Sequence, residues 1–259
     1  MFIDSHCHLD RIDLTPYQND FAVFMQAAKQ QHIQKMLCVA IDLESYPAMR
    51  ALVKDYPQIF LSVGVHPNVE NKQPLTESQL LKWAENDQVI AIGETGLDYF
   101  RSEGDLDWQH QRFKTHIRVA KALKKPLIIH TREAGHDALD VLEQEGAAEV
   151  GGVIHCFTED WEFAKKALAL NFYISFSGIV TFKNALAIQE AAKQIPNDKF
   201  LIETDSPYLA PVPFRGKPNY PLYVPYVAKQ LALLRDVDID TIATQSTANF
   251  NRLFGTHDS

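Results

Sequence analysis

The strongest constraint on the fold is an alternation of short apolar segments and longer amphipathic segments along the whole chain. The apolar segments are often β-branched, as strands buried on both faces of a parallel sheet are. The amphipathic segments repeat apolar residues with helical spacing. The predicted strands are Phe2–Cys7, Lys35–Ala40, Ile59–Val65, Val89–Glu94, Pro126–His130, Gly152–Cys156, Phe172–Phe176 and Phe200–Glu203. The predicted helices are Tyr17–Gln31, Leu43–Tyr56, Thr76–Asn86, Leu106–Leu123, Ala134–Glu145, Trp161–Leu170, Asn184–Gln194, Pro221–Leu234 and Ile239–Phe254.

Eight successive strand–helix units predict an α/β fold of the (β/α)8 TIM-barrel type. A chain of 259 residues suits one such barrel, so we expect a single domain over residues 1–259. An open, doubly wound sheet is the structural alternative. No Gly-x-Gly-x-x-Gly or Walker loop follows any predicted strand, so the sequence gives no support to a nucleotide-cofactor fold.

Composition limits the partners and the compartment. The net charge of −8 argues against a protein that binds nucleic acid tightly and without sequence preference, but not against a nucleic-acid enzyme whose positive charge is supplied by metal. The three cysteines have no Cys-x-x-Cys spacing and are predicted to be reduced. No signal peptide or membrane-spanning run is recognisable, so we expect no membrane contact and a cytoplasmic location. No protein partner is predictable.

The first predicted strand ends in His6-Cys7-His8. Because side chains alternate between the faces of a strand, both imidazoles point to one side and Cys7 points to the other. Two converging imidazoles can bind a metal ion, although an isolated His-x-His pair is equally compatible with two solvated side chains.

The ends of the other predicted strands decide between these two interpretations. Catalytic groups of a (β/α)8 barrel gather at the carboxyl ends of the strands. Five strands end in residues that can bind metal, and these are His6, His8, Glu94, His130, His155 and Asp205. Six such residues at corresponding positions favour a metal site over a set of unrelated solvated side chains.

Six ligands are too many for one tetrahedral ion, so the sequence predicts two divalent cations. Glu94 is the expected bridge, with His6, His8 and Asp205 on one side and His130 and His155 on the other. Such a pair of cations lowers the pKa of a bridging water, and Asp205 is the expected acceptor of its proton.

Further residues are predicted around these ligands. Asp4 and Glu203 have the parity that directs them into the barrel, either to orient the histidines or as members of a buried polar network. Arg132 is a candidate phosphate-binding residue, or else a partner in a surface ion pair. His66 either contacts substrate or anchors its loop. The other five histidines, His116 among them, are assigned no role. The candidate basic residues of the rim are Arg101, Lys183, Arg215 and Lys217.

Eight segments of the chain together form a recognisable set of motifs: Asp4–Asp10, Gly64–Pro67, Gly93–Tyr99, His130–Arg132, Gly152–Phe157, Ser175–Gly178, Glu203–Pro211 and Arg215–Asn219. They resemble the motifs of the TatD family of metal-dependent hydrolases, and the resemblance runs from residue 2 to about residue 254. The resemblance implies a TIM barrel of the amidohydrolase-like superfamily. It also implies the six ligands above with Glu94 bridging, and a metal-dependent deoxyribonuclease that acts as a 3′→5′ exonuclease on single-stranded or damaged DNA.

Three functions are compatible with this site. The first is a phosphodiesterase acting on DNA, supported by the ligand set, Arg132 and the resemblance. The second is a hydrolase of a small-molecule ester or amide, or of aminoacyl-tRNA, because one dinuclear centre can serve acyl and phosphoryl transfer. The third is a binding protein with a relic metal site. The cations could be Zn²⁺, Mn²⁺ or Mg²⁺; four imidazoles suit Zn²⁺ or Mn²⁺ better than Mg²⁺, although nucleases with this resemblance are commonly assayed with Mg²⁺.

Overall fold

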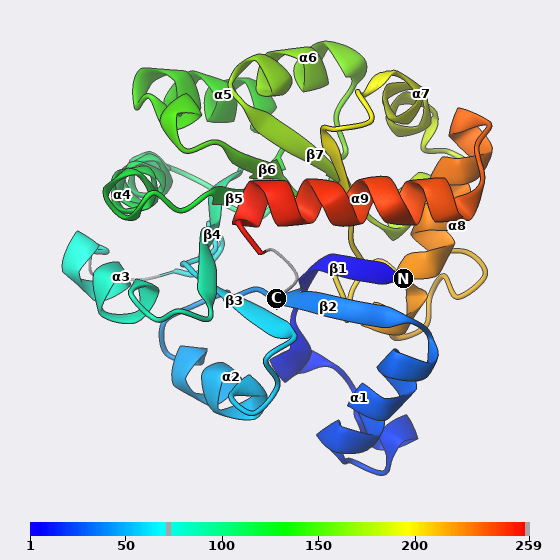
Figure 1. Cartoon of the computed structure of the whole chain (residues 1–259). Coiled ribbons are helices and arrows are strands. Elements are labelled where there is room, and N and C mark those ends of the chain that lie inside the picture. Colours follow the sequence, from blue (N-terminus) through cyan, green and yellow to red (C-terminus); the bar gives the residue numbers. More distant parts are fainter. Residues whose placement is uncertain (71–73, 257–259) are drawn as a thin grey trace. The chain divides into compact units, whose positions relative to one another are not determined.

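Strands and helices alternate along the chain, as the sequence predicts (Figure 1). The structure is a computed structural model that describes residues 1–70 and 74–256. Its strands are β1 (Phe2–Cys7), β2 (Ile33–Cys38), β3 (Ile59–Val63), β4 (Val89–Asp98), β5 (Leu127–Arg132), β6 (Gly152–Ile154), β7 (Phe172–Phe176) and β8 (Phe200–Ile202). Its α-helices are α1 (Phe21–Gln30), α2 (Tyr46–Val53), α3 (Glu77–Ala84), α4 (Asp107–Leu123), α5 (Gly135–Gln144), α6 (Trp161–Ala169), α7 (Leu186–Gln194), α8 (Val224–Arg235) and α9 (Ile239–Phe254). Short 3₁₀ helices cover Leu9–Arg11, Thr15–Tyr17, Ala147–Glu149, Gly178–Thr181 and Pro221–Tyr223.

The eight strands form one sheet in which they follow one another in chain order. Neighbouring strands pair in parallel, for example β1 with β2 and β4 with β5. A parallel bridge between Cys7 and Ser206 joins the end of β1 to the residues that follow β8. Parallel strands in chain order, with the last strand beside the first, define a (β/α)8 barrel. The predicted fold class is therefore confirmed, and the doubly wound alternative is excluded because its strand order reverses.

Two compact units can be distinguished in the chain. The first comprises Met1–Cys38, Cys156–Trp161 and the chain from Ser175 onward, and the second comprises Val39–His155 and Glu162–Ile174. In the first unit, α9 packs against β1 and β8, and in the second, α4 packs against β4 (Figure 1). The prediction of a single domain stays a prediction.

Local chemistry explains where several elements begin and end. Helix α1 starts at Phe21 rather than at the predicted Tyr17, because the Asp20 side chain accepts a hydrogen bond from Ala22 N at 2.7 Å and caps the helix there. Helix α3 starts after Thr76 with a capping box, in which Thr76 N donates to Gln79 Oε1 at 2.8 Å. Strand β4 continues past its predicted end at Glu94 as far as Asp98.

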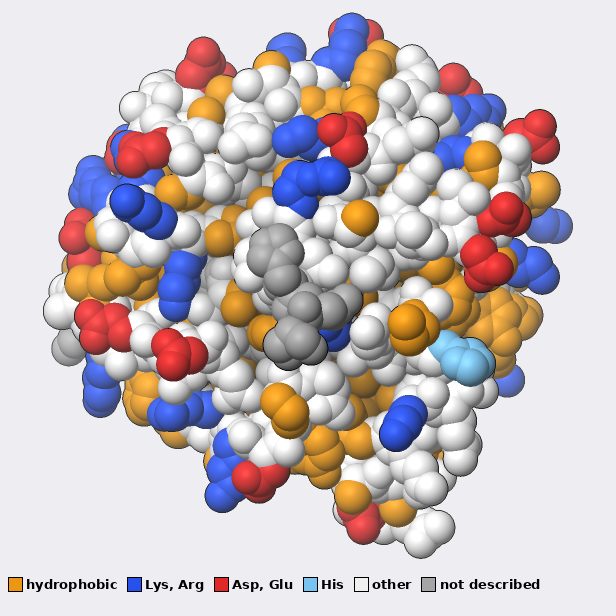
Figure 2. Space-filling model, in the orientation of Figure 1, with side chains coloured by type: hydrophobic (Ala, Val, Ile, Leu, Met, Phe, Trp, Pro, Cys, Tyr) orange, Lys and Arg blue, Asp and Glu red, His pale blue; other side chains and the backbone are white. Residues whose placement is uncertain are grey.

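The core is formed mainly by the strands and by the helix faces that cover them. Strands β5 and β7 bury Leu127, Ile128, Phe172 and Ile174 completely. On the face shown in Figure 2, Lys and Arg side chains are interspersed with Asp and Glu. Among the described residues, no helix combines the length and the apolar character needed to cross a bilayer.

Candidate metal centre

In the first unit, the His-x-His of β1 meets Asp205, which follows β8. His6 Nε2 lies 3.3 Å from His8 Nε2, and Asp205 Oδ1 lies 3.7 Å and 3.4 Å from these two nitrogens. Cys7 points away from the pair, as strand parity requires, and its thiol donates to Leu37 O. The structure thus brings together the three residues that the sequence assigns to one side of the site. We call them the first cluster.

The backbone of Asp205 sets the direction of its side chain. Its φ of 55° lies in the left-handed region, which non-glycine residues adopt rarely. Asp205 N donates to His6 O at 2.9 Å, and His8 N donates to Ser206 O at 2.8 Å. These two bonds fasten the end of β1 to the turn after β8, so the carboxylate and the two imidazoles are held on one rigid support.

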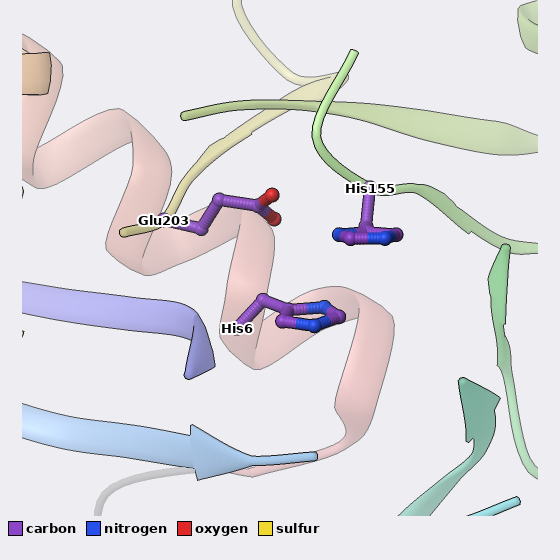
Figure 3. Close-up of side chains that lie close together, drawn as sticks. All are labelled: His6, His155 and Glu203. Atoms are coloured by element: carbon purple, nitrogen blue, oxygen red, sulfur yellow. The ribbon is translucent and has the colours of Figure 1, made fainter. Parts of the chain in front are cut away.

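Two predicted neighbours of this cluster are fully buried in the same unit. Asp4 Oδ1 accepts from Thr204 N at 2.9 Å and from His6 N at 3.2 Å, and burial raises the pKa of Asp4 to about 8. Glu203 accepts from Cys156 N at 2.6 Å, and one of its oxygens lies within 4.8 Å of a ring nitrogen of His6. Figure 3 shows His6 from β1 and Glu203, which directly follows β8, together with His155, which directly follows β6 in the second unit.

In the second unit, Glu94 of β4 meets the histidines of the next two strands. Glu94 Oε1 lies 3.0 Å from His130 Nδ1 and 2.8 Å from His155 Nε2. The two imidazole nitrogens are 3.4 Å apart. The carboxylate is almost completely buried, with 3% of the side chain exposed, and we call these three residues the second cluster.

Two further side chains border the second cluster. His66 Nε2 lies 3.3 Å from Glu94 Oε1, and burial lowers the pKa of His66. Asp98 Oδ2 lies 3.1 Å from His130 Nε2, on the opposite side of the ring from Glu94. Burial opposes the charged form of both partners. Hydrogen bonds outweigh it, so the pKa of Asp98 is lowered and that of His130 is raised.

The donor atoms of the first cluster have the spacing expected around a divalent cation, and those of the second lie somewhat closer together. Ligands bound at about 2.1 Å in a tetrahedral site lie about 3.4 Å apart. The separations are 3.3, 3.4 and 3.7 Å in the first cluster and 2.8, 3.0 and 3.4 Å in the second. Imidazole nitrogens combined with carboxylate oxygens are ligands that Zn²⁺ and Mn²⁺ accept readily.

Arg132 and the predicted rim cations lie in less constrained surroundings. The Arg132 guanidinium is stacked over the ring of Phe100, 3.7 Å from its centroid. Arg215 lies over Phe182 at 4.2 Å in the same manner, in the first unit. Arg101, Lys183 and Lys217 are exposed. Phosphate binding by Arg132 stays a prediction.

No role was assigned from the sequence to Asp98, Asn68 or Arg112. Asp98 faces His130 Nε2, Asn68 Nδ2 donates to Asp98 Oδ2 at 2.8 Å, and Arg112 Nη1 donates to His66 O at 3.1 Å, so all three support the second cluster or its neighbour His66. Asp98 could have been found, because it has the same parity as Glu94 and therefore lies on the same face of one strand. The predicted strand stopped at Glu94, which hid this relation. Asn68 lies in a loop and Arg112 on a helix, and neither position carries a signal of its own.

The comparisons with known proteins agree with this geometry. The sequence model of the family described as TatD related DNase matches residues 3–255. The uncharacterized metal-dependent hydrolase YcfH of Escherichia coli (strain K12) is 45% identical, with 97% of this chain and 95% of that protein covered. The uncharacterized metal-dependent hydrolase YabD of Bacillus subtilis (strain 168) is 40% identical, with coverages of 98% and 99%. The crystal structure of the TatD homologue YJJV from Escherichia coli K12 is 28% identical and has a TM-score of 0.89, covering 99% of this chain and 98% of that one.

The barrel, the first cluster, the pair of Glu94 and His130 with His66 and His155 beside it, and these relatives define a metal-dependent hydrolase. Within that class, the chain belongs to the TatD family, in agreement with the motifs of its sequence.

Proposed function

We propose that this hydrolase cleaves phosphodiester bonds of DNA, and that it removes nucleotides from the 3′ end of a single strand. The observation that carries the proposal is the second cluster, where one buried carboxylate oxygen faces two imidazole nitrogens at 2.8 and 3.0 Å. The description of the family as TatD related DNase supports DNA as the substrate. We also propose the cytoplasm as its location, as expected from the sequence.

Two divalent cations are proposed, one in each cluster. His6, His8 and Asp205 would hold the first, and Glu94, His130 and His155 the second. Bound cations would polarise the phosphoryl group and lower the pKa of the attacking water. The bridging role of Glu94 and the choice among Zn²⁺, Mn²⁺ and Mg²⁺ stay predictions.

The side chains of the protein supply proton transfer and orientation. The Asp205 carboxylate is the proposed general base, because its oxygen faces His6 Nε2 and His8 Nε2 and 13% of the side chain is open to solvent, compared with 1% for His6. Asp4 and Glu203 hold the backbone around it through their bonds to Thr204 N and Cys156 N.

Exposed aromatic rings beside the clusters favour a single strand over a small ester. Tyr208 is 47% exposed, and its ring centroid lies 6.1 Å from that of His8 in the first unit. In the second unit, Phe100 is 54% exposed beneath the Arg132 guanidinium. Unpaired bases stack on aromatic side chains and on arginine, and arginine also binds phosphate.

The test is a nuclease assay on a 5′-labelled single-stranded oligonucleotide, with Mn²⁺, Zn²⁺ or Mg²⁺ added to metal-free protein. We expect a ladder of products shortened from the 3′ end, and strong inhibition by a phosphorothioate linkage at that end. Glu94→Ala serves as the inactive control. Equal product release by the wild type and this variant would contradict the proposal, and turnover restricted to a panel of carboxylic esters, amides and aminoacyl-tRNA would support the alternative hydrolase.

The Asp205→Asn variant tests the general base. Asparagine tolerates the left-handed backbone at this position but cannot accept the proton of water. We expect kcat to fall by about 10²- to 10⁴-fold, whereas most of the metal, measured by mass spectrometry, is retained. Asp236→Asn is the matched control, since Asp236 has a φ of 53° at the exposed end of α8. Loss of all metal from Asp205→Asn would show that the residue is needed for binding rather than for proton transfer.

A further inference from the structure

The imidazole of His66 is fixed in one tautomer by a backbone group. Asn68 N donates to His66 Nδ1 at 3.1 Å. A backbone N–H can only donate, so Nδ1 must carry a lone pair, and the proton of the neutral ring must be on Nε2. His66 therefore directs an N–H group, rather than a lone pair, at Glu94 Oε1 3.3 Å away.

His130 is fixed in the opposite tautomer. Its Nε2 lies 3.1 Å from Asp98 Oδ2. Asp98 also accepts from Asn68 Nδ2 at 2.8 Å and from Arg101 N at 3.0 Å, as an ionised carboxylate does. In the neutral ring the proton of His130 is therefore on Nε2, and the lone pair is on Nδ1, the nitrogen that lies 3.0 Å from Glu94 Oε1. His130 from β5 and His66 from the loop after β3 both approach Glu94 Oε1. Only His130 offers a lone pair to a cation.

The loop that carries His66 is held from several directions. Arg112 Nη1 donates to His66 O at 3.1 Å and to Val69 O at 2.6 Å. His66 N donates to Ile41 O at 2.8 Å. Rotation of the imidazole would break the bond from Asn68 N, so this support preserves the direction of Nε2.

We propose that His66 is not a metal ligand but a hydrogen-bond donor to substrate, and that its single Nε2–H is shared between Glu94 Oε1 and a non-bridging phosphoryl oxygen bound beside the second cluster. The backbone N–H of Asn68 selects the tautomer. His66 can reach substrate because 15% of its side chain is exposed, close to the 18% of His130 and more than the 3% of Glu94 and of His155. The proton stays on Nε2 throughout, so the role is binding and charge stabilisation. This inference rests on the proposed function.

The first test is the tautomer itself. Nitrogen-15 spectra of histidine-labelled protein distinguish protonated, lone-pair and metal-bound ring nitrogens, and the His66→Gln spectrum assigns the signals of His66. We expect His66 to remain protonated on Nε2 after addition of Zn²⁺, while the Nδ1 signal of His130 shifts. Loss of the His66 Nε2 proton on addition of Zn²⁺ would make His66 a ligand and overturn the proposal.

The second test compares three variants. Glutamine can place an N–H near the position of Nε2, whereas asparagine and alanine cannot. We expect His66→Ala and His66→Asn to lower kcat by about 100-fold, as the loss of one donor to a transition-state oxygen does. His66→Gln should recover at least about tenfold of that loss. All three should still bind Zn²⁺ in the second cluster, with no more than the roughly 10- to 100-fold loss of affinity that removal of an outer partner of Glu94 causes, because no ligand is removed.

The outcomes separate this inference from the proposed function. Rates are measured on the oligonucleotide and on bis(p-nitrophenyl) phosphate. Failure of the wild type to cleave either substrate contradicts the proposed function, and the nitrogen-15 spectra then still decide whether His66 is a ligand. Equal rates for the glutamine and alanine variants of an active enzyme, or a loss of Zn²⁺ affinity well beyond about 100-fold in all three variants, would overturn the donor role.

Discussion

At the scale of single residues, the second nitrogen of each imidazole determines what the first can do. His130 has a carboxylate on Nε2, which leaves Nδ1 available to a cation, whereas His66 has a backbone N–H on Nδ1. Two histidines that face the same oxygen of Glu94 thus acquire different chemistry from partners that lie behind them. Mutation of such an outer partner commonly weakens metal affinity by about 10- to 100-fold.

Removal of the Asp98 carboxylate should therefore weaken metal binding without removing a ligand. In Asp98→Ala, His130 loses the acceptor that holds its ring and its tautomer, and we expect the affinity of the second cluster for Zn²⁺ to fall about 10- to 100-fold. Titration against a chromogenic chelator measures it. Asp137→Ala is the matched control, because Asp137 accepts from the Tyr99 hydroxyl at 2.7 Å in the same unit but does not contact the cluster. Equal affinities in the two variants would contradict a positioning role for Asp98.

The residues of the two clusters were predictable because the strand ends supply them in a fixed order. The convergence of His6 and His8 follows from strand parity alone. Their short distance to Asp205 follows from the bridge that places the end of β1 beside the residues after β8. The tautomers were not predictable. They depend on the backbone N–H of Asn68 and on the continuation of β4 to Asp98, and neither is encoded in the type of residue at the ligand positions.

At the scale of elements, one face of α4 supports the residues that follow β3 and the end of β4. Three side chains spaced by three and four residues share that face. Gln109 Oε1 accepts from Asp98 N at 3.0 Å, Arg112 donates to His66 O, and His116 Nε2 accepts from Val65 N at 2.9 Å. Helix α4 thus fixes the position of the loop that carries His66, although none of these three residues was assigned a role from the sequence.

His116 makes this support dependent on pH. The ring is fully buried between Val65 N and Arg112 O, and burial lowers its pKa from 6.5 to about 4. Because the unfolded chain binds a proton at higher pH than the folded chain, the free energy of unfolding is unaffected above pH 6.5 and falls as the pH drops from 6.5 to 4. The expected loss over this window is about 3 kcal/mol.

Urea unfolding at a series of pH values measures this loss. Glutamine at position 116 can accept from Val65 N but does not titrate, so His116→Gln should be less dependent on pH in this window. The exposed His136 lies on helix α5 and provides the control His136→Gln, which should keep the slope of the wild type. An unchanged slope in His116→Gln would show that other groups cause the pH dependence.

Element types were more predictable than element ends. Every predicted strand and helix is present, because apolar runs and amphipathic periodicity extend over many residues. The ends depend on single contacts, such as the Asp20 cap that delays α1, or the pairing with β5 that prolongs β4 to Asp98. These contacts form between groups that the local pattern does not relate.

At the scale of the whole molecule, metal binding should contribute directly to stability. The first cluster joins the first strand to the turn after the last, and the second joins three successive strands, so neither exists in the unfolded chain. A cation that binds only the folded protein stabilises it by about 2.7 kcal/mol at a concentration 100 times its Kd. For a chain of this length that amounts to an increase in Tm of roughly 5–10 °C for each ion.

Thermal unfolding with a chelator and with excess Mn²⁺ or Zn²⁺ checks this expectation, and variants separate the two clusters. His6→Ala should lose the increase due to the first cluster and bind one ion, and His130→Ala should lose the increase due to the second. In each variant the other cluster keeps all of its ligands, so about half of the increase should remain. His110→Ala is the control, because His110 lies 2.8 Å from the Tyr99 hydroxyl, outside both clusters. The same increase in all three variants would mean that the cations bind elsewhere, whereas its complete loss in either cluster variant would mean that the two sites bind metal as one unit.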